Sequence, residues 1–192
     1  LAATLLQEAS QVCTDELADP NRAVGLLERV RSTEERAAVE QQIEELCERH
    51  QLHDARARLF ERRMAAASPQ DAVDHALALS ELCLDALDDG PRAFDCLEQV
   101  SALLPFSHTL QDTLLARMQV VAEKTDQWGR LAEHLGTRAT ARIHAGDVDA
   151  GVADIRSAAT MLSERSGDHL AALRLTVAGL GGGPPASSLF LD

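Results

Sequence analysis

An internal repeat constrains the fold of this chain more than any other feature of its sequence. The segment DELADPNRAVGLLERV, residues 15–30, returns as DALDDGPRAFDCLEQV at residues 85–100, and eight of the sixteen positions are identical. A weaker third copy lies 149 residues after the first, where Asp168 stands in the place of Asp19. Repeats of this kind indicate stacked supersecondary units, each of which buries its apolar face against a neighbour.

The repeated phrase has the pattern of a helix start followed by a packing stripe. Asp19 and its copy Asp89 are expected to cap a new helix, with Pro or Gly directly behind them. Ala23 is expected to be small because the preceding helix crosses there. Leu27 and Val30 follow at helical spacing and are expected to fill the gap between hairpins. The phrase is therefore interpreted as scaffold, without catalytic chemistry.

Composition and helix-end signals predict an all-α chain of about ten helices. Aromatic residues make up only 3% of the 192 residues, there is no Tyr, and the helix formers Ala and Leu dominate. Capping residues, Pro and Gly recur at short intervals, and connections of two to four residues make neighbouring helices antiparallel. The expected helical segments are 3–17, 20–31, 34–50, 53–67, 70–87, 90–103, 107–125, 127–145, 148–166 and 168–179.

Two stretches resemble a known repeat family, the tetratricopeptide repeat (TPR) family, in a degenerate form. The residues that carry the resemblance are Ala93, Leu97, Val100 and Pro105 in one helix and Gly146, Asp147, Gly151, Ile155 and Ala158 in a later turn and helix. The family's first-helix aromatics are missing, residues 53–67 fit poorly, and the seventh to ninth helices can be paired in either of two frames.

The resemblance implies a right-handed superhelical stack of antiparallel helical hairpins, a TPR-like α-solenoid of about five hairpins over residues 1–180. It further implies recognition of a peptide or protein on the concave surface that the first helix of each pair lines. This leads to the expectation of a non-enzymatic scaffold or adaptor that binds a protein or peptide partner. The alternative is a regulatory or oligomerisation segment of a larger multidomain enzyme or signalling protein.

The net charge and the cysteines of the chain indicate which partners and which cellular compartment to expect. The formal charge is −13, with 31 acidic and 18 basic residues, and such a surface repels phosphate backbones, so no nucleic-acid partner is expected. No apolar run is long enough to predict membrane insertion. The four cysteines, Cys13, Cys47, Cys83 and Cys96, lie among apolar residues without zinc-site spacing, which predicts buried free thiols and a reducing, cytoplasmic location.

No pattern in the sequence predicts an active site. His50 and His53, with Glu48 nearby, come closest to a metal site, but a catalytic zinc needs three protein ligands and no third is indicated. The polar residues of a helix end are the better interpretation. Neither a Gly-x-Ser-x-Gly elbow nor a Gly-rich phosphate loop is present. We therefore expect no enzyme activity, no cofactor and no metal.

The one basic cluster of this acidic chain is a candidate for partner binding. Arg58 and Arg62 are expected on one helix face, and Arg56 and Arg63 on another. These arginines could bind an acidic peptide or a phosphate, or they could pair with the preceding helix through Glu44, Glu45 and Glu48. Ion pairing within the chain is the favoured interpretation. Trp128 is a second candidate, either as an exposed hot spot or as a side chain packed between hairpins.

The last twelve residues differ from the rest. Residues 181–188, GGGPPASS, predict a flexible linker, and Leu189, Phe190 and Leu191 form a short apolar tail. The tail could begin another domain, fold back over the last hairpin, dock in a groove as a linear motif, or be an engineered ligand peptide. Because solenoids need their terminal apolar face covered, self-association through the tail is one expectation.

Overall fold

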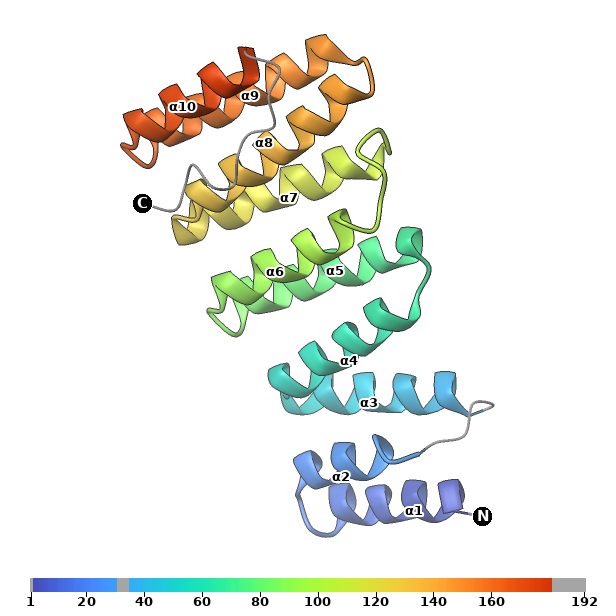
Figure 1. Ribbon diagram of the computed structural model, residues 1–192. Helices are drawn as coiled ribbons and strands as arrows, with labels where there is room; N and C mark the ends of the chain where they lie inside the picture. The colour runs from blue at the N-terminus through green and yellow to red at the C-terminus, as the bar shows by residue number, and fades with distance from the viewer. Residues whose placement is uncertain (1, 31–34, 181–192) are drawn as a thin grey trace. The chain divides into compact units, whose positions relative to one another are not determined.

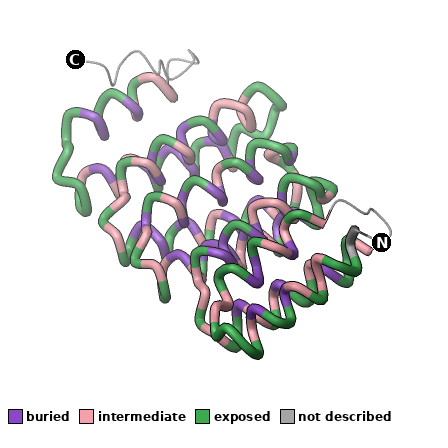
Figure 2. The backbone as a smooth tube through the Cα atoms, turned by 90° about the horizontal axis from the view of Figure 1, so that it is seen from below, coloured by how far each residue is buried: buried purple, intermediate pink, exposed green. Residues whose placement is uncertain are grey.

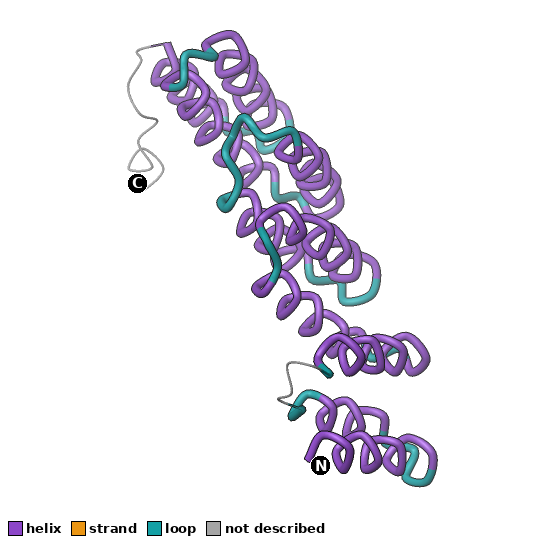
Figure 3. The backbone as a smooth tube through the Cα atoms, turned by 90° about the vertical axis from the view of Figure 1, so that its right-hand side faces the viewer, coloured by secondary structure: helices purple, strands orange, loops and turns teal. Residues whose placement is uncertain are grey.

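The computed structural model describes residues 2–30 and 35–180, and within these ranges it contains ten α-helices and no strand (Figures 1 and 3). The helices are α1 (Ala2–Asp15), α2 (Pro20–Leu27), α3 (Arg36–His50), α4 (His53–Ala66), α5 (Pro69–Asp85), α6 (Gly90–Ser101), α7 (Leu110–Thr125), α8 (Trp128–His144), α9 (Val148–Glu164) and α10 (His169–Leu180). The predicted all-α class and the predicted number of helices are confirmed.

Most predicted boundaries lie within two or three residues of the observed ones, and the start of α7 shows why one of them differs. The prediction began this helix at residue 107, but the preceding loop is held by the side chain of Gln111 instead. Its amide nitrogen donates to the carbonyl oxygens of Ser101, at 2.8 Å, and Leu104, at 3.1 Å.

The helices divide into two compact units, residues 1–89 and 90–192. In the described part of the first unit each helix from α1 to α5 packs on the next. Its apolar core combines α2, α3 and α4, with buried residues on the faces that the helices turn toward one another (Figure 2). The buried members of this core are Val24, Leu27, Val39, Ile43, Cys47, Ala55 and Leu59.

The described part of the second unit packs α6 on α7, α7 on α8, α8 on α9 and α9 on α10, and α8 packs more extensively on α9 than on α7. Gly151 permits this close approach, because a Cβ atom there would lie 2.9 Å from the carbonyl oxygen of Ala139. A residue without a side chain is therefore needed at this position by the packing of the helices.

The three copies of the repeated phrase form the same turn. In each copy the backbone N–H of the aspartate donates to the carbonyl oxygen six residues earlier: Asp19 to Cys13 at 2.9 Å, Asp89 to Cys83 at 2.9 Å, and Asp168 to Leu162 at 2.8 Å. The residue before the aspartate has a positive φ in each copy: Ala18 at 50°, Asp88 at 51° and Gly167 at 69°. The same turn thus precedes α2, α6 and α10.

The side chains of the repeated phrase also behave as their pattern predicts. The Asp19 carboxylate accepts a hydrogen bond from the backbone N–H of Arg22 at 3.0 Å and caps α2. Ala23 is fully buried where α2 packs on α1, and the corresponding Ala93 is fully buried as well. The phrase therefore marks the start of α2, α6 and α10 in the same way.

Candidate partner-binding grooves

Each unit has a groove between two helices that are separated in the sequence by one other helix. In the first unit a groove of about 470 Å³ runs between α1 and α3. In the second unit a groove of about 590 Å³ runs between α7 and α9. Partner binding on such a surface stays a prediction, and of the residues that line the two grooves only Trp128 was named from the sequence.

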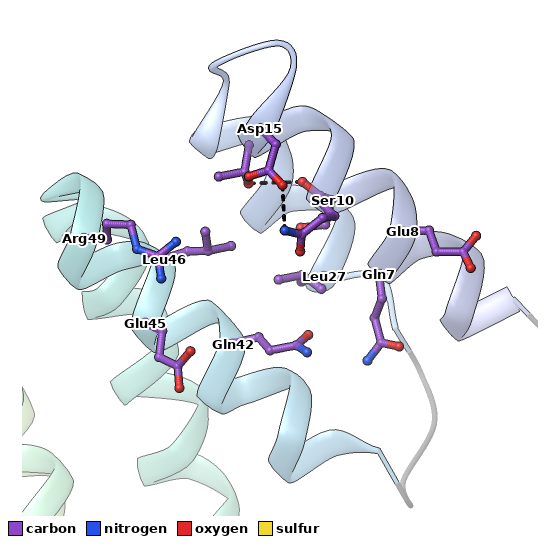
Figure 4. Close-up of a pocket in the computed structure, with 11 residues that line it drawn as sticks. Gln7, Glu8, Ser10, Asp15, Leu27, Gln42, Glu45, Leu46 and Arg49 are labelled. Carbon is purple, nitrogen blue, oxygen red and sulfur yellow. Dashed lines mark hydrogen bonds between the residues drawn. The ribbon is translucent and has the colours of Figure 1, made fainter.

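The α1/α3 groove has polar walls and a small apolar floor (Figure 4). Leu27 lies between the two helices, and Leu46 and Arg49 extend from α3 toward α1. Gln11 is already engaged, because its amide nitrogen donates to the carboxylate of Asp15 at 2.7 Å. The groove therefore offers amide, carboxylate and guanidinium groups around a leucine floor, a surface suited to a polar segment of a partner chain.

The α7/α9 groove is more amphipathic. Val120 of α7 is exposed, Met161 of α9 is half-buried, and Trp128 at the start of α8 also lines the groove. Trp128 is half-buried, and the guanidinium of Arg165 lies 5.2 Å from the centroid of its ring, a cation–π distance. The ring thus packs against the C-terminal end of α9 and still lines the groove. Trp128 is therefore packed on one side and accessible on the other, and its role in partner binding stays a prediction.

Many arginines of the described residues pair with carboxylates, and three of the five without such a partner line the grooves. The described arginines with no carboxylate partner among the described residues are Arg22, Arg29, Arg49, Arg156 and Arg165. Arg49 lines the α1/α3 groove, and Arg156 and Arg165 line the α7/α9 groove. In an acidic protein, guanidinium groups left unpaired beside a groove are available to an anionic group of a partner.

The basic cluster of α4 is occupied within the chain. Arg56 contacts Glu48 at 2.6 Å, and Arg63 contacts Glu44 at 2.7 Å, as the ion-pair interpretation expected. Arg58 and Arg62 instead approach Glu28, the residue that follows the last residue of α2, at 3.9 and 3.3 Å.

The prediction was wrong about Glu45, because its carboxylate accepts a hydrogen bond from Gln41 at 3.1 Å on the same helix. Partner binding by the α4 arginines stays a prediction, and a partner would have to compete with these carboxylates. Leu189, Phe190 and Leu191 lie outside the described residues.

A buried ion-pair network that the sequence did not predict joins three helices of the second unit. Arg138 of α8 donates to both carboxylate oxygens of Asp154 on α9, at 2.9 and 2.6 Å. Arg142 donates to the same carboxylate at 3.0 Å, and Arg138 also reaches Asp112 of α7 at 3.0 Å. A bidentate pair of this kind fixes the register of α9 against α8, and so holds the wall of the α7/α9 groove in place.

Two further titratable groups have pKa values that burial shifts. Burial, and next to it the charge of Arg138, lowers the pKa of His134 to about 4, and its ring nitrogen lies 3.4 Å from the hydroxyl of Ser101. Burial raises the pKa of the Cys47 thiol. All four cysteines are buried free thiols, as predicted. Neither His134 nor Cys47 lines a groove, and both are interpreted as structural.

The two histidines that came closest to a metal-site pattern in the sequence lie at the junction of α3 and α4. His50 ends α3 and His53 begins α4, so the two histidines flank a helix junction as expected. Over residues 2–30 and 35–180, no group of three or more His, Cys, Asp and Glu side chains is placed to hold a metal ion. The helices in these ranges also lack the length and apolar character that a membrane crossing requires.

Comparison of the chain with protein-family models, with curated proteins and with solved structures finds no match.

Proposed function

We propose that this protein is a non-enzymatic binding module that holds a partner protein or peptide against the first helices of its hairpins. The observation that carries the proposal is the α7/α9 groove, which brings an aromatic ring, apolar side chains and two unpaired arginines to one surface. Interfaces draw most of their binding energy from such aromatic and arginine side chains. The α1/α3 groove adds a second, more polar surface of the same kind.

The chemistry of the α7/α9 groove indicates what a partner segment would present. Trp128 and Met161 can take an apolar side chain, and the guanidinium of Arg156 can pair with a carboxylate beside it. The carboxylates of Glu123 and Glu164 on the same walls would disfavour a strongly acidic stretch. A mixed segment, with one apolar anchor and one acidic group, fits this groove best.

A matched pair of charge reversals tests the proposal. The full chain is used as bait, and each protein that it captures is then measured against the purified variants by calorimetry. Arg156→Glu is expected to weaken binding of a true groove partner about tenfold or more, the size of effect at a central interface arginine. Arg29→Glu is the control, because Arg29 is also exposed and unpaired among the described residues but lines neither groove.

Trp128→Ala is expected to lower the affinity for the same partner, because it removes the aromatic side chain that lines the groove. The fold of each variant is checked by circular dichroism before binding is measured. Equal affinities for the wild type, Arg156→Glu and Trp128→Ala would show that partners bind elsewhere and would reject the groove as the site. A captured protein that also loses affinity for Arg29→Glu is recognised by general charge alone.

A further inference from the structure

The last helix of the described chain has apolar residues on every side. Between His169 and Leu180 the only polar side chains are those of Arg174 and Thr176, besides His169 itself. A helix that is apolar all round is normally buried all round. On α10, however, the side chains of Leu170, Leu173 and Val177 are 57%, 60% and 60% exposed. Their spacing of three and four residues places them on one face, which therefore lacks a cover among the described residues.

The internal repeat shows that one of these positions is a packing position. Leu173 corresponds to Val24 in the first copy of the repeated phrase and to Phe94 in the second. Val24 is 1% exposed and Phe94 is fully buried, whereas Leu173 is the one open member of the three. In the first unit the cover of Val24 comes from the next helix, since Val24 shares one apolar core with Val39 and Ile43 of α3.

The spacing along the chain identifies the segment that would cover Leu173. Val39 follows Val24 by fifteen residues, and Leu110, the first residue of α7, follows Phe94 by sixteen. Sixteen residues after Leu173 the chain has Leu189, which opens the apolar triplet Leu189, Phe190 and Leu191. The triplet therefore stands at the sequence position from which the next helix packs on α2 and on α6.

We propose that Leu189, Phe190 and Leu191 pack on the α9/α10 groove of their own chain and cover Leu173 as α3 covers Val24. The groove has a volume of about 560 Å³ and an apolar lining that includes Val152, Ile155 and Leu173.

The reach of the chain is sufficient for this contact. Residues 181–188 separate α10 from the triplet, and eight residues span at most roughly 26–29 Å. Leu173 lies seven residues before the end of α10, which at the helical rise per residue is about 10 Å.

Hydrogen exchange of the full chain, followed by mass spectrometry, tests the proposal. The variant Phe190→Asp with Leu191→Asp removes the apolar cover, and the amides of α10 are expected to exchange about tenfold faster, the effect of losing one well-packed apolar contact. The matched control is Ser187→Asp with Ser188→Asp, which adds the same charge to the preceding segment and is expected to leave the exchange of α10 unchanged. The amides of α7 report that the unit remains folded.

The variant Leu173→Asp tests the other side of the contact. It is expected to accelerate exchange in α10 by a similar factor, and its combination with the Phe190→Asp and Leu191→Asp pair should add little, because both remove one interaction. Unchanged exchange of α10 in the Phe190→Asp and Leu191→Asp variant would overturn the proposal. Protection of α10 that rises with protein concentration would overturn it too, because the cover would then be a second copy of the chain.

Discussion

The α4 arginine cluster of the first unit and the Arg138–Asp154 pair of the second differ in how far their charges are buried. In the first unit the four arginines of the α4 cluster reach glutamates of α2 and α3 with side chains that remain 19–53% exposed. In the second unit the side chains of Arg138 and Asp154 are only 4% and 7% exposed. Exposed pairs contribute little to stability, but breaking a buried pair leaves a charge without water or partner. The same residue types therefore act as surface charge in the α4 cluster and as a structural constraint at Arg138 and Asp154.

Removal of the buried carboxylate is the strongest test of this difference. Asp154→Ala leaves the guanidinium of Arg138 buried and without its bidentate partner, and it is expected to lower the free energy of unfolding by about 3–5 kcal/mol. Urea titration followed by circular dichroism measures this change. A loss below about 1 kcal/mol, the range of exposed pairs, would mean that water reaches this network and that the two units do not differ.

Low pH should destabilise the second unit through protonation of His134. Its pKa is about 4 in the folded chain and near 6.5 when the chain unfolds, so folding disfavours the protonated ring. The stability that depends on the neutral ring is complete above pH 6.5 and is lost as the pH falls toward 4, by on the order of 3 kcal/mol.

The measurement is the free energy of unfolding as a function of pH for the wild type and for His134→Gln, which keeps a polar side chain without a titration in this range. The wild-type curve should fall more steeply than that of the variant between these pH values. Parallel curves would show that His134 is protonated as easily in the folded chain as in the unfolded one.

The repeated turn occurs in both units. Substitution of the residue with positive φ should lower the stability of the chain at one copy and raise it at another. Gly167 has a positive φ and open space around the position of a Cβ atom, so Gly167→Ala is expected to cost about 1 kcal/mol through backbone conformation alone. Ala18 already bears that cost, and Ala18→Gly is expected to stabilise the chain by about 0.5 kcal/mol after the extra entropy of glycine in the unfolded state. The melting temperature should fall in Gly167→Ala and rise in Ala18→Gly. Changes in the same direction would contradict a shared turn.

The smallest change in the free energy of unfolding is expected for the exposed ion pairs of the α4 cluster. Arg63→Met keeps most of the aliphatic packing of this side chain and removes its contacts with Glu40 and Glu44. The expected loss is about 0.5 kcal/mol, and it should shrink further in high salt because surface pairs are screened. A loss as large as that of Asp154→Ala, unaffected by salt, would place this pair in the buried class.

Local patterns in the sequence predicted the fold well because helix ends are coded by nearby residues. Asp19 with Pro20 and Gly146 with Asp147 mark ends that the structure places where the prediction did. The start of α7 was misplaced because it depends on Gln111, whose amide holds the loop through contacts seven and ten residues away. Such a contact leaves no periodic signal in the sequence.

The candidate site was harder to predict, because grooves form between helices that are distant in the sequence. Val120 and Arg156 line one groove although thirty-six residues separate them. The basic cluster of α4 stood out by composition but lies against glutamates, whereas the unpaired arginines are scattered singly along the chain. The spacing of four residues that places Arg138 and Arg142 on one face of α8, together with Leu131 and Leu135, was a signal of the buried network in the sequence.

Site-specific photo-crosslinking tests most directly whether the repeated turns are scaffold and the grooves between first helices bind the partner. A benzophenone side chain is placed at Gln119, an exposed residue of the α7/α9 groove, or at Glu133, an exposed residue of α8 that lines none of the grooves described above. Binding in the groove predicts efficient crosslinking of the partner from Gln119 and little from Glu133. Equal yields from both positions, or a higher yield from Glu133, would contradict it.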